Sequence, residues 1–150
     1  MGPLEKLRAF GLSPSDIPKA AWMGVMDSFS PEFEEHAVDY NTVANQVFNE
    51  QGSHNEKYNR TKGFHGGLDY MLRFGRSKED AEKVARLYQL KQAMFRDPKQ
   101  DLLDLEANLA GISHGASNPG MKPSQGQILD PEQYEALLQL ARDYADRTSR

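Results

Sequence analysis

The sequence predicts an all-α fold, and three observations support this prediction. Apolar residues recur at three- and four-residue spacing over long stretches, as they do along one face of an α-helix. No stretch alternates apolar and polar residues as a half-buried strand would. Capping residues stand directly before prolines, a pattern typical of helix starts. These pairs are Ser30-Pro31, Asp97-Pro98 and Asp130-Pro131. We expect a single irregular bundle of about seven helices.

The first half of the chain contains two short helices and one long one. The short helices are predicted over residues 3–10 and 18–28. The long helix is predicted over 31–51, because its apolar residues, among them Tyr40 and Val47, keep helical spacing throughout and Gly52 can end it.

Four more helices follow a polar segment at 52–61. They cover residues 62–74, 78–95, 98–110 and 130–150. Gly75 suits the end of the first of them, and Ser77 with Asp80 resembles a capping box at the start of the second. The last helix is amphipathic.

Glycine and proline concentrate in residues 112–129, just before the last helix. This composition predicts a flexible tether, although packing could order it. The predicted organisation is therefore a helical domain at 1–111, a tether at 112–129 and a C-terminal amphipathic helix at 130–150.

Composition and charge exclude several classes of protein. The chain has 150 residues, a formal net charge of -4 and no cysteine, which rules out disulfides, thiol catalysis and thiolate metal sites. The start of the chain lacks the apolar core of a signal peptide, and no window reaches the roughly 20 apolar residues of a membrane span. We therefore expect a soluble protein, cytoplasmic or virion-associated.

The segment around His65 is the first candidate for chemistry. Asp69 follows one helical turn later, within reach of the imidazole, and could orient it for proton transfer or metal binding. Gly66 and Gly67 each cost about 1 kcal/mol relative to Ala inside a helix. They therefore indicate close approach of another backbone or of a ligand, unless they only break the helix start, where His65 would cap it.

Glu106 is the second candidate, because it lies in the middle of a broad apolar arc of its helix. A carboxylate there is either buried or pointed into a cleft, and it needs a partner. The alternative is a structural ion pair or a hydrogen bond to a helix end. Together these positions give His65, Asp69 and Glu106 as candidate catalytic residues.

Histidines and carboxylates also raise the question of a divalent metal. The chain has enough histidines and carboxylates for such a site, if His36, His54 and His114 are counted with the three candidates. No H-E-x-x-H or comparable spacing is present, so the cofactor stays unknown. His36 falls on the apolar arc of its helix and is expected to be a structural residue. His114 follows a predicted helix end.

Two further patterns are interpreted as non-functional. Residues 111–115 match the G-x-S-x-G nucleophile elbow, but that elbow requires a preceding strand, whereas Ser113 follows a predicted helix. Basic residues interleave with aromatic ones between Lys57 and Lys78, as in some nucleic-acid-binding surfaces. Because the rest of the chain is acidic, a solvated surface is favoured over nucleic-acid binding.

Residues 63–111, with G-F-H-G-G-L-D-Y and D-L-E-A-N-L-A-G, resemble an uncharacterised helical domain family of bacterial toxin-like and phage-associated proteins. That family carries an Arg-His-Ala motif and a closing Asp-x-x-x-Asn-x-x-Gly. The matching residues are His65, Asp104, Asn108 and Gly111; the departures are Phe64 for Arg, Gly66 for Ala, Leu68 for Trp and Glu106 for a second His. The resemblance implies a polar site shared by two helices, without a settled activity.

Two hypotheses of function follow from these observations. The first is a hydrolase-like effector or toxin-type domain, in which His65 is a general base or ligand, Asp69 orients it and Glu106 is an acid or ligand. The second is a non-catalytic interaction or assembly protein, such as a phage accessory or virion component. It would bind protein partners through its amphipathic helices and the tether. The oligomeric state is not predicted.

Overall fold

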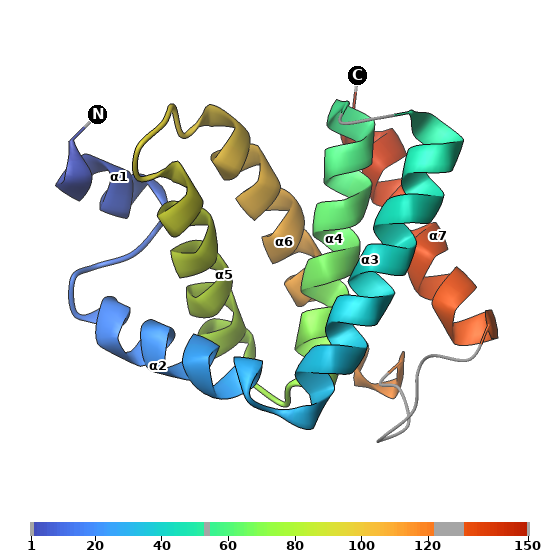
Figure 1. Ribbon diagram of the computed structural model, residues 1–150, viewed down its shortest axis with the longest axis horizontal. Helices are drawn as coiled ribbons and strands as arrows, with labels where there is room; N and C mark the ends of the chain where they lie inside the picture. The colour runs from blue at the N-terminus through green and yellow to red at the C-terminus, as the bar shows by residue number, and fades with distance from the viewer. Residues whose placement is uncertain (1, 53–54, 122–130, 150) are drawn as a thin grey trace.

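The computed structural model describes residues 2–52, 55–121 and 131–149, and this part of the chain forms a bundle of helices (Figure 1). The α-helices are α1 (Pro3–Ala9), α2 (Asp16–Ser28), α3 (Pro31–Gln51), α4 (Glu56–Arg73), α5 (Lys78–Ala93), α6 (Lys99–Ser117) and α7 (Pro131–Thr148), with a short 3₁₀ helix, η1, at Pro119–Met121. The described residues contain no strand. The predicted all-α class and the count of about seven helices are therefore confirmed.

Helices α4 and α6 form the centre of the bundle (Figure 1). Helix α5 packs on the side of α6 away from α4, and α2 packs on α5. Helices α3 and α7 both pack on α4. No helix within the described ranges carries an apolar stretch of the length needed to cross a bilayer.

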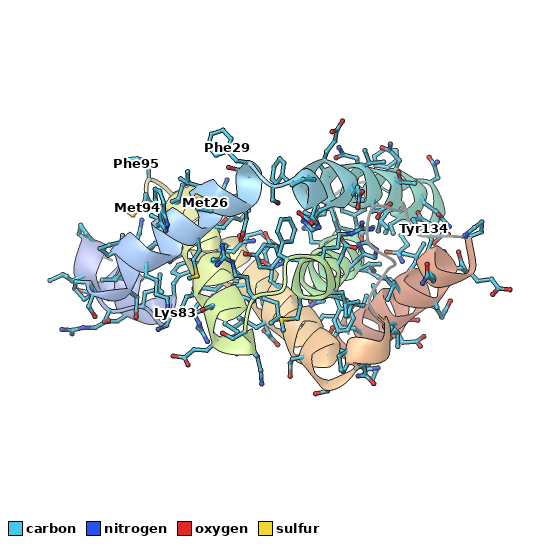
Figure 2. All side chains as sticks on the ribbon, turned by 90° about the horizontal axis from the view of Figure 1, so that it is seen from below. Met26, Phe29, Lys83, Met94, Phe95 and Tyr134 are labelled. Carbon is cyan, nitrogen blue, oxygen red and sulfur yellow. The ribbon has the colours of Figure 1, made fainter. Side chains whose placement is uncertain are left out.

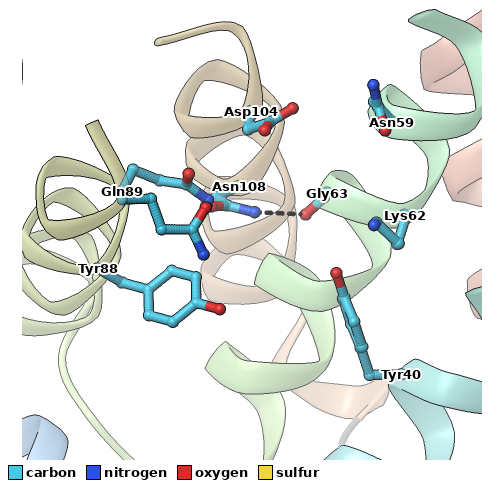
Figure 3. Close-up of a pocket in the computed structure, with 9 residues that line it drawn as sticks. Tyr40, Asn59, Lys62, Gly63, Tyr88, Gln89, Asp104 and Asn108 are labelled. Carbon is cyan, nitrogen blue, oxygen red and sulfur yellow. Dashed lines mark hydrogen bonds between the residues drawn. The ribbon is translucent and has the colours of Figure 1, made fainter. Parts of the chain in front are cut away.

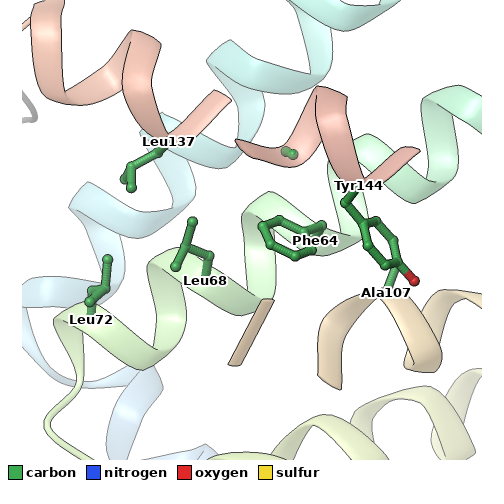
Figure 4. Packing of buried hydrophobic residues seen from close by; sticks show 7 residues of the cluster. Phe64, Leu68, Leu72, Ala107, Leu137 and Tyr144 are labelled. Atoms are coloured by element: carbon green, nitrogen blue, oxygen red, sulfur yellow. The ribbon is translucent and has the colours of Figure 1, made fainter. Parts of the chain in front are cut away.

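The C-terminal helix shares its core with the centre of the bundle. Phe64 and Leu68 of α4 contact Leu137 of α7 in one buried cluster (Figure 4). The ring of Phe64 also stacks on that of Tyr144, with centroids 4.9 Å apart. Helix α7 therefore covers α4 directly and completes the hydrophobic core on that side.

A buried lysine links α1 to the end of α5 by hydrogen bonds. The Lys6 ammonium donates to the carbonyl oxygens of Ala93, Met94 and Arg96 at 2.9, 2.9 and 3.1 Å. These carbonyls belong to the last turn of α5 and the residues after it, where a helix has no amide donors left. One side chain thus satisfies three acceptors and fixes α1 in place.

Glycines let the backbones of α4 and α6 approach more closely than larger residues would allow. A Cβ atom at Gly67 would lie 2.1 Å from the carbonyl oxygen of Asn108, and one at Gly111 would lie 2.1 Å from that of Phe64. The predicted close approach of another backbone is confirmed for Gly67. The alternative, a break at the helix start, is wrong because α4 runs without interruption through this segment.

Helix α4 begins earlier than the sequence predicted. Its first residue is Glu56, within the segment predicted as a polar connection, and Asn55 caps it by accepting a hydrogen bond from the Tyr58 amide at 2.8 Å. Arg60 and Thr61 are buried there. Nε of Arg60 donates to Glu56, and the Thr61 hydroxyl donates to the Lys57 carbonyl, one helical turn earlier. The prediction of a polar connection is therefore wrong from Glu56 onwards, because these polar residues are helical.

The predicted tether at 112–129 is wrong for its first part. Residues 112–117 continue α6, and buried Gly115 lies against Met71 of α4, where an added Cβ would be 3.1 Å from the Met71 Cβ. Contact with α4 therefore orders a glycine-containing segment as helix. Residues 119–121 form η1, and 122–129 lie outside the described residues.

Candidate functional site

The imidazole of His65 is fully buried and makes no hydrogen bond to any described residue. It is 0% exposed, and neither ring nitrogen has a partner in the part of the chain that the structure describes. Burial, with a smaller contribution from nearby His36, lowers the pKa of His65 to about 3. The imidazole is therefore neutral at neutral pH and shielded from solvent, which is unsuited to a general base acting on an external substrate.

Asp69 binds other residues than His65. Its Oδ2 lies 2.5 Å from Nδ1 of His36, and its Oδ1 accepts from Nε of Arg73 at 2.6 Å. Burial raises the pKa of the Asp69 carboxyl, while the bond to His36 acts in the opposite direction. The prediction that Asp69 orients His65 is wrong, because neither His65 nitrogen bonds Asp69, whose carboxylate bonds His36 and Arg73 instead.

Asp69 belongs to a group of ionisable residues between α3 and α4, which we call the Arg73 network: Glu35, His36, Asp39, Asp69 and Arg73. The Arg73 guanidinium bonds all three carboxylates, including Glu35 at 3.1 Å, and its side chain is 2% exposed. These bonds join α3 to α4 across their interface. No three His, Asp or Glu side chains among the described residues are arranged to hold a metal ion.

Glu106 is exposed, so the prediction that it is buried or faces a cleft is wrong. Its electrostatic neighbours are Arg60 and Tyr144, whereas His65 interacts with His36 of α3. The stripe of α6 that carries Glu106 also carries Leu103 and Ala110, and both are only partly buried. The apolar arc thus extends beyond the packed face, and the structure does not bring Glu106 and His65 together.

The remaining predicted groups have structural surroundings. Ser113 lies inside α6 with no strand before it in the described residues, which agrees with the rejection of a nucleophile elbow. His114 also lies inside α6, with its ring centroid 6.0 Å from that of Phe64. His36 is hydrogen-bonded to Asp69, and His54 lies outside the described residues.

Most of the basic residues between 57 and 78 are paired with carboxylates. The pairs are Lys57 with Asp146, Arg60 with Glu56, Arg73 with Glu35, Asp39 and Asp69, and Arg76 with Asp27. Arg60 and Arg73 are also buried. Few cations of this cluster therefore lack a carboxylate partner among the described residues.

Sequence reasoning missed a small polar pocket between α3, α4, α5 and α6 (Figure 3). Its volume is about 130 Å³, and residues that line it include Tyr40, Lys62, Tyr88, Gln89, Asp104 and Asn108. Asp104 and Asn108 belong to the D-L-E-A-N-L-A-G segment, which was expected to take part in a polar site shared by two helices. The polar residues of this segment were the only feature of the sequence that pointed to the pocket.

Sequence reasoning also missed an exposed apolar surface on α2. We call it the α2 face, and it consists of Trp22, Val25, Met26 and Phe29, with exposed fractions of 64%, 47%, 47% and 82%. Phe29 projects away from the bundle at the end of α2 (Figure 2). The spacing of these residues places them along one side of the helix.

No protein-family model, curated protein or solved structure matches this chain. The functional interpretation therefore rests on the geometry of the molecule.

Proposed function

We propose that this chain is a non-catalytic interaction protein and that its α2 face binds an amphipathic, basic helix of a partner protein. The observation that supports the proposal is the exposure of Trp22 and Phe29, at 64% and 82%. Contiguous exposed apolar patches on soluble domains commonly mark interaction sites.

The packing of the bundle leaves most of the α2 face exposed. Helix α2 buries a different stripe, formed by Ala20, Met23 and Asp27, of which Asp27 bonds Tyr70 and Arg76. That inward stripe packs the helix against the bundle. The side chains of Trp22 and Phe29 stay largely in water, and a bound partner would remove them from it.

The size of the α2 face fits a single helix. At their observed exposures, Trp22 and Phe29 together present on the order of 300 Å² of apolar surface. A stable interface between two globular domains buries roughly 800 Å² on each partner. The exposed area at these two residues is below that value, and an amphipathic helix binds through a few apolar anchors at i, i+3, i+4 and i+7 spacing.

Charge next to the α2 face favours a basic occupant. Glu32 and Glu34 lie just beyond Phe29, in the first turn of α3, and form no ion pair within the described residues. Near the other end of α2, Lys19 and Asp16 are already paired, with Asp80 and Lys83. The free charges at the edge of the face are thus negative, and lysines or arginines flanking an apolar seam would complement them.

The single tryptophan of the chain, Trp22, reports directly on binding at this face. The probe is a synthetic amphipathic helix with a leucine seam and lysine flanks, and a glutamate-flanked version is its control. We expect the lysine peptide to shift Trp22 emission to the blue with saturation, and the glutamate peptide to bind at least about tenfold more weakly.

Two aromatic substitutions provide a matched comparison. Phe29→Asp should weaken the lysine peptide by about tenfold or more, whereas Phe95→Asp, at the 98% exposed Phe95 beyond α5, should not. Equal effects of the two substitutions, or no binding of either peptide, would overturn the proposal. Emission that depends on protein concentration, with dimers in sedimentation, would instead assign the face to a second copy.

A further inference from the structure

We propose that the polar pocket between α3, α4, α5 and α6 binds a small zwitterion with the chemistry of an α-amino acid. In this arrangement Lys62 receives the carboxylate of the ligand and Asp104 receives its ammonium group. The pocket is separate from the α2 face, so this inference stands or fails independently of the proposed function. Figure 3 shows these two side chains on neighbouring helices around the pocket.

Lys62 supplies a cation without a carboxylate partner among the described residues. Its Nζ lies 5.0 Å from the ring centroid of Tyr58 and 5.7 Å from that of Tyr40, and the side chain is partly buried. Aromatic faces stabilise an ammonium only partly, and they leave its N–H groups able to donate. A ligand carboxylate is the natural acceptor for these donors.

Asp104 supplies the opposite charge. Its Oδ1 accepts from Nε2 of Gln100 at 3.0 Å, and Oδ2 has no partner in the described part of the chain. Lys62 interacts electrostatically with Asp104, but the two form no ion pair. The pocket thus presents a cation and an anion at separate positions. A zwitterion carries a carboxylate to match the first and an ammonium group to match the second.

Hydrogen bonds fix the wall of the pocket between Lys62 and Asp104. Asn108 Nδ2 donates to the Gly63 carbonyl at 2.9 Å, and its Oδ1 accepts from Gln89 Nε2 at 2.9 Å. A pre-organised wall lowers the entropy cost of binding.

The volume limits the ligand to a few heavy atoms. An apolar cavity of roughly 150 Å³ holds benzene, which has six heavy atoms. At about 130 Å³ the pocket accommodates a molecule close to the size of alanine. Tyr88 is 57% exposed and Gln92 is also exposed, so a longer side chain would leave the pocket past these two residues.

The experiment is a titration of the isotope-labelled full chain followed by amide chemical shifts. L-alanine is the probe, and acetate and methylammonium, which each carry one charge, are the controls. We expect saturable shifts at Gly63, Gln89 and Asn108 with a Kd on the order of 1 mM or tighter. Acetate and methylammonium should each bind at least about tenfold more weakly. Equal binding of acetate would mean a simple anion site and would overturn the proposal.

Substitutions then test the two charged side chains. Lys62→Met and Asp104→Asn should each weaken L-alanine by about tenfold or more. Their matched controls are Lys99→Met, at an exposed lysine, and Asp143→Asn, where the exposed carboxylate accepts from Gln139 as Asp104 does from Gln100. The proposal is overturned if no amide shifts saturably, or if the pocket variants bind as the controls do.

Discussion

At the scale of single residues, His65 is the most unusual feature of the core. Its ring is 0% exposed and neither ring nitrogen has a partner in residues 2–52, 55–121 or 131–149, whereas most buried polar groups in native proteins are hydrogen-bonded. A buried donor without an acceptor costs roughly 1–3 kcal/mol. His65 therefore lowers the free energy of unfolding at neutral pH. The free energy falls further at acid pH, where the ring is protonated in the unfolded state but not in the folded state.

The sign of the pH effect follows from the lowered pKa of His65. In the folded protein this pKa is about 3, below the value of roughly 6.5 expected in the unfolded chain. Between these values only the unfolded state binds the proton, so acid destabilises the fold by up to about 1.4 kcal/mol per pH unit. His65→Leu should be at least as stable as the original chain at neutral pH, and its advantage should widen by roughly 3 kcal/mol near pH 4.

Urea unfolding at a series of pH values measures this difference. His65→Asn is a useful second variant, because it removes the titration but keeps a buried polar group. It should lose the acid dependence in the same way and yet be less stable than His65→Leu throughout. A gap between His65→Leu and the original chain that stays constant with pH would contradict the assignment.

At the scale of helices, the sequence predicted most of the structure. The apolar spacing and Gly52 placed α3 correctly, and the Ser77 hydroxyl does accept from the Asp80 amide at 3.1 Å as the capping pattern suggested. The first turns of α4 and the last turns of α6 were missed. Both segments are polar or glycine-rich, and they are helical because contacts with other helices and local side-chain bonds outweigh their composition.

Two helical glycines, one at the α4–α6 contact and one on α2, give predictions of opposite sign. A methyl group at Gly111 would lie 2.1 Å from a backbone oxygen of α4, so Gly111→Ala should destabilise the fold by about 1–3 kcal/mol or more. Gly24 of α2 has no atom within 4 Å of the same position. Gly24→Ala should therefore stabilise the chain by about 0.5–1 kcal/mol through helix propensity. Thermal unfolding of the two variants checks both signs, and stabilisation by Gly111→Ala would rule out the close contact.

At the scale of the whole molecule, the candidate site could not be predicted, because the choice of partners depends on how helices pack. Asp69 has one histidine four residues away and another far along the sequence, and it bonds the distant His36. Helical spacing placed Glu106 on an apolar arc, but it could not say how much of that arc would be covered. The α2 face was equally hidden, since α2 has apolar residues on two sides and only the packed structure shows which one is buried.

The same dependence on packing decides whether the C-terminal helix is a separate unit, as the division at residues 112–129 predicts, or part of one cooperative fold. Leu138 of α7 is 0% exposed and packs with Val43 and Val47 of α3. Leu138→Ala should therefore destabilise the whole molecule by about 2–5 kcal/mol in a single transition. It should also speed hydrogen exchange at the Val43 and Val47 amides as well as in α7. Leu4→Ala, at a leucine that is 62% exposed, should change stability by less than about 0.5 kcal/mol. Faster exchange confined to α7 would mean that this helix unfolds alone. Faster exchange in α3 as well would mean that α7 unfolds together with the helices it packs on, α3 and α4.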